Sequence, residues 1–255
     1  YFNQEGIIKN TGFERMSGRI NLDSKLSDKS RFGVNLSIAE TKSKVAPTGL
    51  VTALLSMPPT ATIYEADGSY TLRNPFENIF SNPIATLNER KNNAVNTRTL
   101  GTVFGEYDLL ENLVLKVSFG ADLIANKETT YIPSTIYEGL ITNGEARIGN
   151  GNNKTWLNEN TLTYTKVFAD VHSFNVLAGY TQQSSTRDFV TTGSQQFVND
   201  ITADNSLQSG NLALIPTSGE SKWALNSYLS RLNYNYDSKY YFTASIRADG
   251  SSRFG

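Results

Sequence analysis

The chain has 255 residues, with 23 Lys and Arg against 24 Asp and Glu, so its formal net charge is -1. Proteins that bind a polyanion need clustered surplus cations, so this balance argues against nucleic-acid binding. The chain has no cysteine and one histidine, His172. This excludes disulfide scaffolds, thiolate metal sites and most histidine-based catalysis. The longest apolar stretch, Leu50 to Leu55, is far shorter than the roughly 20 residues of a membrane-spanning helix.

Apolar and polar side chains alternate over long stretches, first from residue 17 to residue 41 with a polar turn at 27–30. Two alternating runs joined by a short polar turn predict a β-hairpin. The unit recurs three times, and a slip in the alternation near 227–230 indicates a bulge. The sequence therefore predicts an all-β, antiparallel chain of about eight strands in four hairpins. The later strands are expected at 99–109 and 113–126, 156–168 and 174–183, and 224–236 and 240–249.

The connections alternate between tight turns and long segments. The tight turns fall at 27–30, 110–112, 169–172 and 237–239, and His172 is interpreted as a solvent-facing turn residue. The long connections span 44–96, 128–153 and 189–222, with a short helical turn at 49–57. Short turns on one side and long loops on the other are typical of outer-membrane barrels, whose strands need only alternate apolar residues. We therefore expect a segment of an antiparallel up-and-down transmembrane β-barrel.

The alternation assigns a side chain to each face of this wall. One face is apolar and is expected to contact lipid: Ile20, Leu22, Val34, Leu36, Leu115, Val117, Ala244 and Ile246. The other face is polar and is expected to line the lumen: Arg19, Asp23, Lys116, Asp122, Arg231, Arg247 and Asp249. Aromatic residues near the tight turns predict an interfacial girdle: Phe32, Phe168, Phe174, Tyr234, Tyr236, Tyr240 and Phe242.

Several stretches resemble a known family. They are YFNQEGIIKNTG at 1–12, GRINL at 18–22, NENTLTY at 158–164, LAGY at 177–180 and ASIRADGSSRFG at 244–255. The segment DGSY at 67–70 also looks like the family's first long loop. Together these stretches are similar to the SusC/RagA group of TonB-dependent outer-membrane transporters of Bacteroidetes. The resemblance covers essentially the whole chain, and the stretch at 244–255 carries most of its specificity.

The resemblance implies that residues 1–255 are one part of a single barrel domain. Family barrels are plugged and have about 22 strands, so the plug and the remaining strands would lie outside this segment. The implied function is import of a glycan, oligosaccharide or peptide across the bacterial outer membrane, together with a SusD-like surface lipoprotein. Energy would arrive from TonB through an N-terminal region that this segment lacks. No bond is made or broken in such a mechanism, so no enzymatic activity is expected.

The long loops are the predicted place of recognition. Aromatic rings among Asn, Ser and Thr suit sugar stacking, and they equally suit packing on a lipoprotein; the sequence leaves both open. The candidates are Tyr64, Tyr70, Phe76, Phe80, Tyr131, Tyr137 and Phe197. Asp200 and Asp204 could hold calcium, but their spacing matches no EF-hand loop. No cofactor is therefore predicted.

Three other classes of protein remain as alternatives. A soluble or surface-exposed β-sheet binding protein or adhesin would explain the polar loops, but not their one-sided lengths. An outer-membrane protease or lipase would need a catalytic cluster at the outer rim, whereas His172 lies at the tight-turn end. A passive porin is the nearest alternative.

Overall fold

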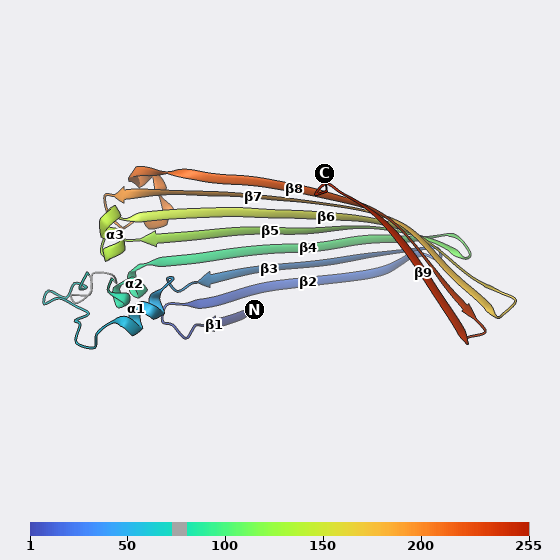
Figure 1. Cartoon of the computed structure of the whole chain (residues 1–255), viewed down its shortest axis with the longest axis horizontal. Helices are drawn as coiled ribbons and strands as arrows, with labels where there is room; N and C mark the ends of the chain where they lie inside the picture. The colour runs from blue at the N-terminus through green and yellow to red at the C-terminus, as the bar shows by residue number, and fades with distance from the viewer. Residues whose placement is uncertain (73–80, 255) are drawn as a thin grey trace.

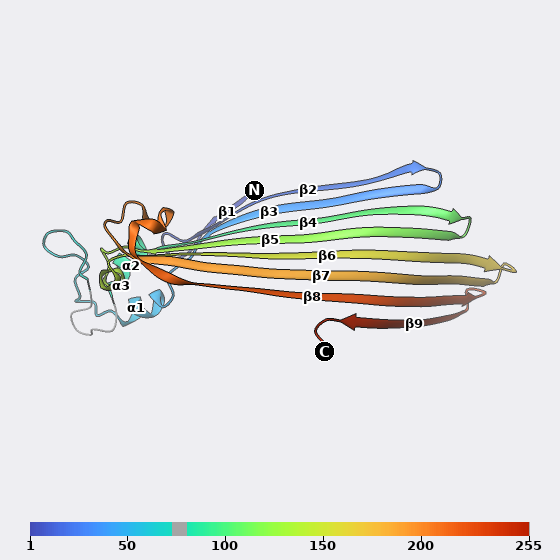
Figure 2. The ribbon, with the colours of Figure 1, turned by 90° about the horizontal axis from the view of Figure 1, so that it is seen from above.

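The computed structural model describes residues 1–72 and 81–254, which form a single antiparallel sheet of nine strands in the order β1 to β9 (Figures 1 and 2). Every strand pairs only with its neighbours in sequence. The strands are β1 (Phe2–Glu5), β2 (Gly12–Ser27), β3 (Ser30–Lys44), β4 (Lys91–Leu110), β5 (Leu113–Ile132), β6 (Glu145–Phe168), β7 (His172–Phe197), β8 (Gly210–Tyr236) and β9 (Tyr240–Ser251). The predicted all-β, up-and-down architecture is confirmed.

All the helices lie at one end of the sheet, opposite the tight turns (Figure 1). They are α1 (Leu50–Ser56), α2 (Pro83–Glu89), α3 (Tyr137–Thr142) and the 3₁₀ turns η1 (Ala203–Asn205) and η2 (Leu207–Ser209). Helix α1 confirms the predicted helical turn. None of the helices in the described ranges has the length and apolar character needed to cross a membrane.

The strand count differs from prediction because β1 was missed. It has only four residues, too few to show alternation, and it is recognised by its pairing with Phe13 and its neighbours on β2. The tight turns agree with prediction, with one refinement. His172 is the first residue of β7 and not a solvent-facing turn residue, since its ring stacks on Tyr234 and its Nδ1 lies 2.8 Å from the Tyr234 hydroxyl.

The predicted loops at 128–153 and 189–222 are largely wrong. Strands β5 to β8 run on through most of these residues, and the true connections are 133–144 and 198–209. The Asn-, Gly- and Thr-rich sequence hides the strands because both of their faces are polar there, so no apolar alternation marks them. The ladder of backbone hydrogen bonds continues nevertheless, as the pairing of Gly149 with Thr191 illustrates.

The predicted bulge at 227–230 is absent, because the β7–β8 and β8–β9 registers run without a shift through these residues. The irregularities fall elsewhere, between Lys25 and Ser27, at Asp108, and between Thr191 and Gly193.

The registers place the two predicted side-chain sets on opposite faces. Directly paired residues share a face, and successive residues alternate. Thus Leu22, Val34 and the apolar set share one face, and all seven predicted lumen residues share the other. The apolar face has no protein cover in this sheet: Ile20 is 63% exposed and Ile246 is 74% exposed.

Two asparagines interrupt the apolar face, and both are satisfied within the sheet. The Asn160 side chain donates to the Asn158 Oδ1 at 2.6 Å, and Asn158 donates to the Ser118 carbonyl at 3.0 Å. Polar groups that face hydrocarbon need such internal partners, so these residues are compatible with a lipid-facing surface.

Candidate functional site

The polar face of the wall holds a network of four alternating charges near the tight-turn end. Arg31 contacts Asp23 at 3.0 Å and Glu106 at 3.6 Å, and Lys116 contacts Glu106 at 2.9 Å. The same two cations lie over the Phe104 ring, at 5.6 Å and 4.4 Å from its centroid. Asp23 and Lys116 were predicted for this face, whereas Arg31, which contacts both carboxylates, was not.

The Phe104 ring fits because the strand beside it has no side chain at Gly33. A Cβ on Gly33 would stand 2.2 Å from the Phe104 Cε1 atom. Glycine is therefore required where the ring lies flat across the neighbouring strand. This fixes both cations around one aromatic surface.

The remaining predicted wall charges fall into two groups. Asp122 pairs with Arg98 at 2.7 Å, and Arg247 pairs with Asp249 at 2.7 Å while donating to the Ser227 hydroxyl. Arg19 and Arg231 lie on the same face by register. That this face lines a lumen stays a prediction. Most charged side chains on this face form ion pairs with a neighbour. This is typical of a solvated surface and not of a catalytic cluster.

The two later loops are joined through the Asp200 carboxylate. It accepts hydrogen bonds from the Tyr131 hydroxyl at 2.5 Å, the Ser134 backbone N–H at 3.1 Å and the Ser134 hydroxyl at 2.8 Å. Burial opposes ionisation of Asp200, but these hydrogen bonds outweigh it and hold its pKa below the usual range. Burial and the adjacent carboxylate raise the pKa of Tyr131. Asp200 is therefore the anionic tie between the loops.

A small hydrophobic core surrounds this tie. Tyr131 and Phe197 are each only 2% exposed, and their rings meet edge to face with centroids 5.7 Å apart. Ala146 and Ala203 complete the core, with Leu207 packed against it. Tyr131 and Phe197 were predicted as ligand or partner contacts. The contact role stays a prediction, and their burial argues for a packing role in the loops instead.

The first loop presents two more of the aromatic candidates. Tyr64 and Tyr70 form a bridge around Gly68, and their rings stack with centroids 5.1 Å apart. Asn88 on α2 donates to the Tyr70 hydroxyl at 3.0 Å, which leaves Tyr64 as the more exposed ring. In the turn, hydrogen bonds from Ser69 hold the pKa of Asp67 below its usual range. A rigid aromatic pair is thereby displayed at the loop surface.

Helix α2 links the first loop to the second. Asn82 caps it by accepting from the backbone N–H groups of Ile84 and Ala85, and it donates to the Ile63 carbonyl at 2.8 Å. Glu138 on α3 accepts from the Ser81 and Thr86 hydroxyls. Consequently the loops brace one another instead of standing apart, and Tyr137 begins α3 half-buried within them. Phe76 and Phe80 lie outside the described residues.

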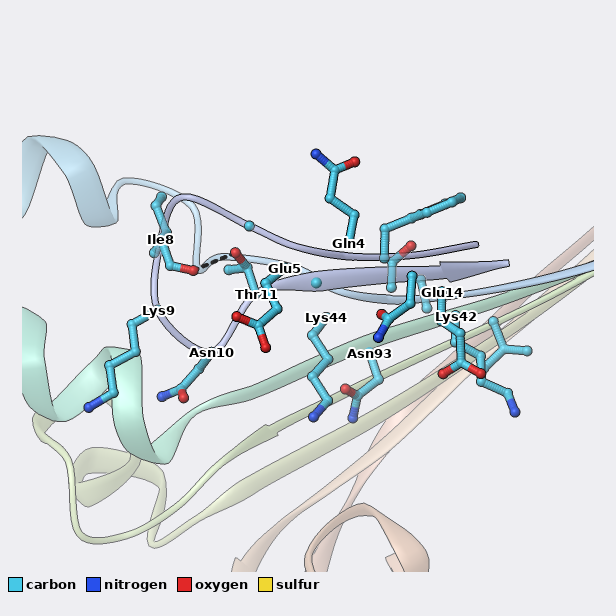
Figure 3. A pocket seen from close by; sticks show the side chains of 17 residues that line it. Gln4, Glu5, Ile8, Lys9, Asn10, Thr11, Glu14, Lys42, Lys44 and Asn93 are labelled. Atoms are coloured by element: carbon cyan, nitrogen blue, oxygen red, sulfur yellow. Dashed lines mark hydrogen bonds between the residues drawn. The ribbon is translucent and has the colours of Figure 1, made fainter. Parts of the chain in front are cut away.

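A polar pocket of about 660 Å³ opens at the loop end of β1 to β3 (Figure 3). Lys44 and Asn93, which are paired across β3 and β4, lie together on one side of it with Lys9. The Thr11 hydroxyl donates to the Ile8 carbonyl and holds the turn before β2. None of the predicted aromatic candidates lines this pocket, but Asn10 in its lining donates hydrogen bonds to Leu87 and Asn88 on α2, each at 3.2 Å.

That the loop at 199–205 holds no calcium stays a prediction. Among the residues that the structure describes, no group of three His, Cys, Asp or Glu side chains is placed to hold a metal ion. Asp200 already accepts hydrogen bonds from Tyr131 and Ser134.

Phe189 and Trp223 on the polar face were not predicted, because Phe189 lies in the loop expected at 189–222 and Trp223 falls just before the strand expected at 224–236. Sequence reasoning also missed α2, although Asn82 followed by Pro83 is a cap-and-first-turn signal that could have found it.

Comparison with curated proteins tests the predicted resemblance. The chain is 34% identical over its whole length to TonB-dependent receptor P26 of Formosa agariphila. It is also 25% identical over its whole length to TonB-dependent receptor SusC of Bacteroides thetaiotaomicron. The predicted resemblance to SusC-type TonB-dependent receptors is confirmed. The chain spans about a quarter of each relative, 26% of the first and 27% of the second. No family model matches it.

Solved structures agree on the fold of this segment. The structure of the RagAB peptide transporter matches the whole of this chain with a TM-score of 0.83 at 24% identity. The match covers 30% of the transporter chain. BauA, the ferric preacinetobactin receptor of Acinetobacter baumannii, matches 98% of the chain with a TM-score of 0.55 at 12% identity. At these identities the likeness establishes the architecture alone. It identifies the nine strands as consecutive strands of a β-barrel wall.

Proposed function

We propose that this chain is barrel wall and extracellular loops of an energised outer-membrane importer that takes up an oligosaccharide or a peptide. The observation that carries the proposal is similarity to SusC-type TonB-dependent receptors over the whole of this chain, together with a sheet that has one apolar and one charged face. TonB would act on the part of the protein outside these residues. The mechanism is binding followed by gated passage, without chemical change in the solute.

A SusD-like lipoprotein is the proposed partner. The braced loops display apolar side chains that water would not favour, including Leu55 on α1 at 83% exposed and Ile141 on α3 at 73% exposed. Apolar and aromatic side chains of this kind are concentrated in the centres of protein interfaces. The RagAB structures are of a peptide importer, which makes a peptide the second class of solute to test.

Uptake by whole cells tests the proposal. Cells that express the full-length protein are given fluorescent oligosaccharides and peptides, with and without a protonophore. We expect uptake that requires the protein and stops when the proton-motive force is removed. Uptake that continues after de-energisation would instead identify a passive porin. Surface binding without uptake would identify an adhesin.

A further inference from the structure

Among the exposed aromatic rings on the polar face, which include Phe2 and Tyr241, Phe189 is the one that lies between two glycines. Phe189 on β7 is 47% exposed, and it lies directly between Gly151 on β6 and Gly219 on β8. The ring leans over Gly219, where a Cβ would stand 2.7 Å from the Phe189 Cε1 atom. Because neither glycine has a side chain, one face of the ring lies against backbone and the other face is exposed.

The position of Phe189 lies above the membrane band. It is about 17 residues from the tight turn at His172, which corresponds to ~56 Å along a strand. A strand tilt of about 40° turns this into ~43 Å of height, against an apolar band of ~25 Å. The opposite face is polar at this level, where the Asn152 amide donates to Asp188 at 2.8 Å. Phe189 therefore faces an aqueous extracellular vestibule.

Beside this ring stands a cation without a partner. Arg187 precedes Phe189 on the same face, is exposed, and makes no ion pair within residues 1–72 and 81–254. By register, the nearest carboxylates on this face are Asp122 and Glu128 on β5, two strands or ~10 Å across the sheet and a further ~7 Å and ~13 Å along the strand, respectively. Arg98 already holds Asp122. The Arg187 guanidinium thus keeps its planar fork of donors for an incoming anion.

The surrounding side chains are small or polar. Asn153 and Ser221 lie opposite Arg187 on the two neighbouring strands. Trp223, the other large ring at this level, already has the Arg253 guanidinium 5.0 Å from its centroid. Phe189 is therefore the ring with a free face. A pyranose can stack its apolar face on such a ring while its hydroxyl groups bond to amide and hydroxyl neighbours.

We propose that Phe189 and Arg187 form a binding subsite for an oligosaccharide that carries a carboxylate or a sulfate. Phe189 stacks on a sugar ring, and Arg187 binds the anionic substituent on the same or the next residue. This inference rests on the proposed function and narrows its solute to an anionic carbohydrate. A flat ring with a single adjacent cation favours a sugar over a peptide, whose extended backbone would instead need a row of backbone partners.

Binding to the purified full-length transporter in lipid nanodiscs tests the subsite. The probes are maltoheptaose, an oligogalacturonate for carboxylate, a carrageenan oligosaccharide for sulfate, and an acidic peptide, each measured by calorimetry. We expect tighter binding of one anionic oligosaccharide than of maltoheptaose. Phe189→Ala should weaken that binding about tenfold or more. Arg187→Gln should remove the preference for the anionic probe, and Arg187→Lys should restore part of it.

The matched control is Phe104→Ala, which removes a ring lying over a glycine in the same way but at the tight-turn end of the wall. Equal loss in both phenylalanine variants would show that wall packing, not a subsite, explains the effect, and would overturn the inference. Unchanged binding in Phe189→Ala, or binding of the peptide alone, would also overturn it. If the wild type binds no probe and imports none, the proposed function fails. If the wild type binds and imports while all the variants match it, only the subsite fails.

Discussion

Replacing Val117 by arginine tests whether the apolar face contacts lipid. Val117 lies on β5 about five residues above the tight turn, which places it ~13 Å above that turn at a strand tilt of about 40°. This is the middle of a ~25 Å apolar band, where a lipid-facing arginine costs about 2–4 kcal/mol. Asn160 lies opposite on the same face and offers one polar partner, so we expect the lower half of that range.

The matched control is the adjacent residue, Ser118, whose side chain is on the other face. Its register partners are Phe104 and Glu159, so Ser118→Arg meets an aromatic ring and a carboxylate. We expect Ser118→Arg to lower the free energy of unfolding by less than about 1 kcal/mol, because charged side chains in contact with water change stability by amounts of this size. Reversible urea unfolding of the full-length barrel in lipid vesicles measures both variants. A difference of about 2 kcal/mol is a factor of roughly 30 in the folding equilibrium. Equal destabilisation of the two variants would refute the lipid-face assignment.

The other predictions concern Gly33 beside the Phe104 ring, the Asp200 contacts and the exposed loop residues. Gly33→Ala should lower the free energy of unfolding by about 1–3 kcal/mol in the same assay, because its Cβ would stand 2.2 Å from Phe104. Adding Phe104→Leu should recover most of this stability. A double variant as unstable as Gly33→Ala would contradict the clash. Asp200→Asn should speed limited proteolysis of the loops at 133–144 and 198–209, because it removes the anionic tie to Tyr131 and Ser134; an unchanged cleavage rate would contradict the role. The folded-state pKa of Asp200 is depressed, so its stabilisation is present above the ordinary carboxyl pKa and lost as the pH falls through the folded value. The protection factors of amide hydrogen exchange in these loops should therefore fall in acid below the ordinary value of 3.8, and less so in Asp200→Asn. Leu55→Asp with Ile141→Asp should release the lipoprotein partner from the full-length complex in size-exclusion chromatography, whereas Leu36→Ala should not.

The wall was predictable where one face is apolar. Residues such as Ile20, Leu22, Val34 and Leu36 alternate with polar neighbours, and this pattern alone gave the hairpins, their tight turns and the facing of the wall charges. The alternation fails above the membrane. Glu145 to Asn153 form a strand because they pair with β5 and β7, and nothing in their composition marks it. Tertiary pairing decides the structure there.

The candidate site was harder to predict because burial of loop aromatics depends on partners distant in sequence. Tyr131 and Phe197 look like recognition residues by composition, yet they meet in a core that exists only because Asp200 joins two loops. Conversely, Phe189 was set aside with a presumed loop and proves to be an exposed ring on a strand. An aromatic ring is exposed where the neighbouring strands have glycine beside it. A single sequence does not reveal which residues are neighbours across the strands near the loop end of the wall.

The neighbour-only pairing has a consequence for how the wall assembles. Since each strand from β1 to β9 bonds only to the strands before and after it, no pairing waits for a distant part of the chain. Folding can therefore proceed hairpin by hairpin, with the largest loop-closure entropy at β3 and β4, which are joined through residues 45–90. The same simplicity carries a risk. In the stretches where both faces are polar, such as β6 against β7 near Gly149, a slip of one residue exposes no charge to lipid and is weakly opposed. Correct register in the extracellular wall must therefore be inherited from the membrane band, where a slip would turn Asp23 or Lys116 towards lipid.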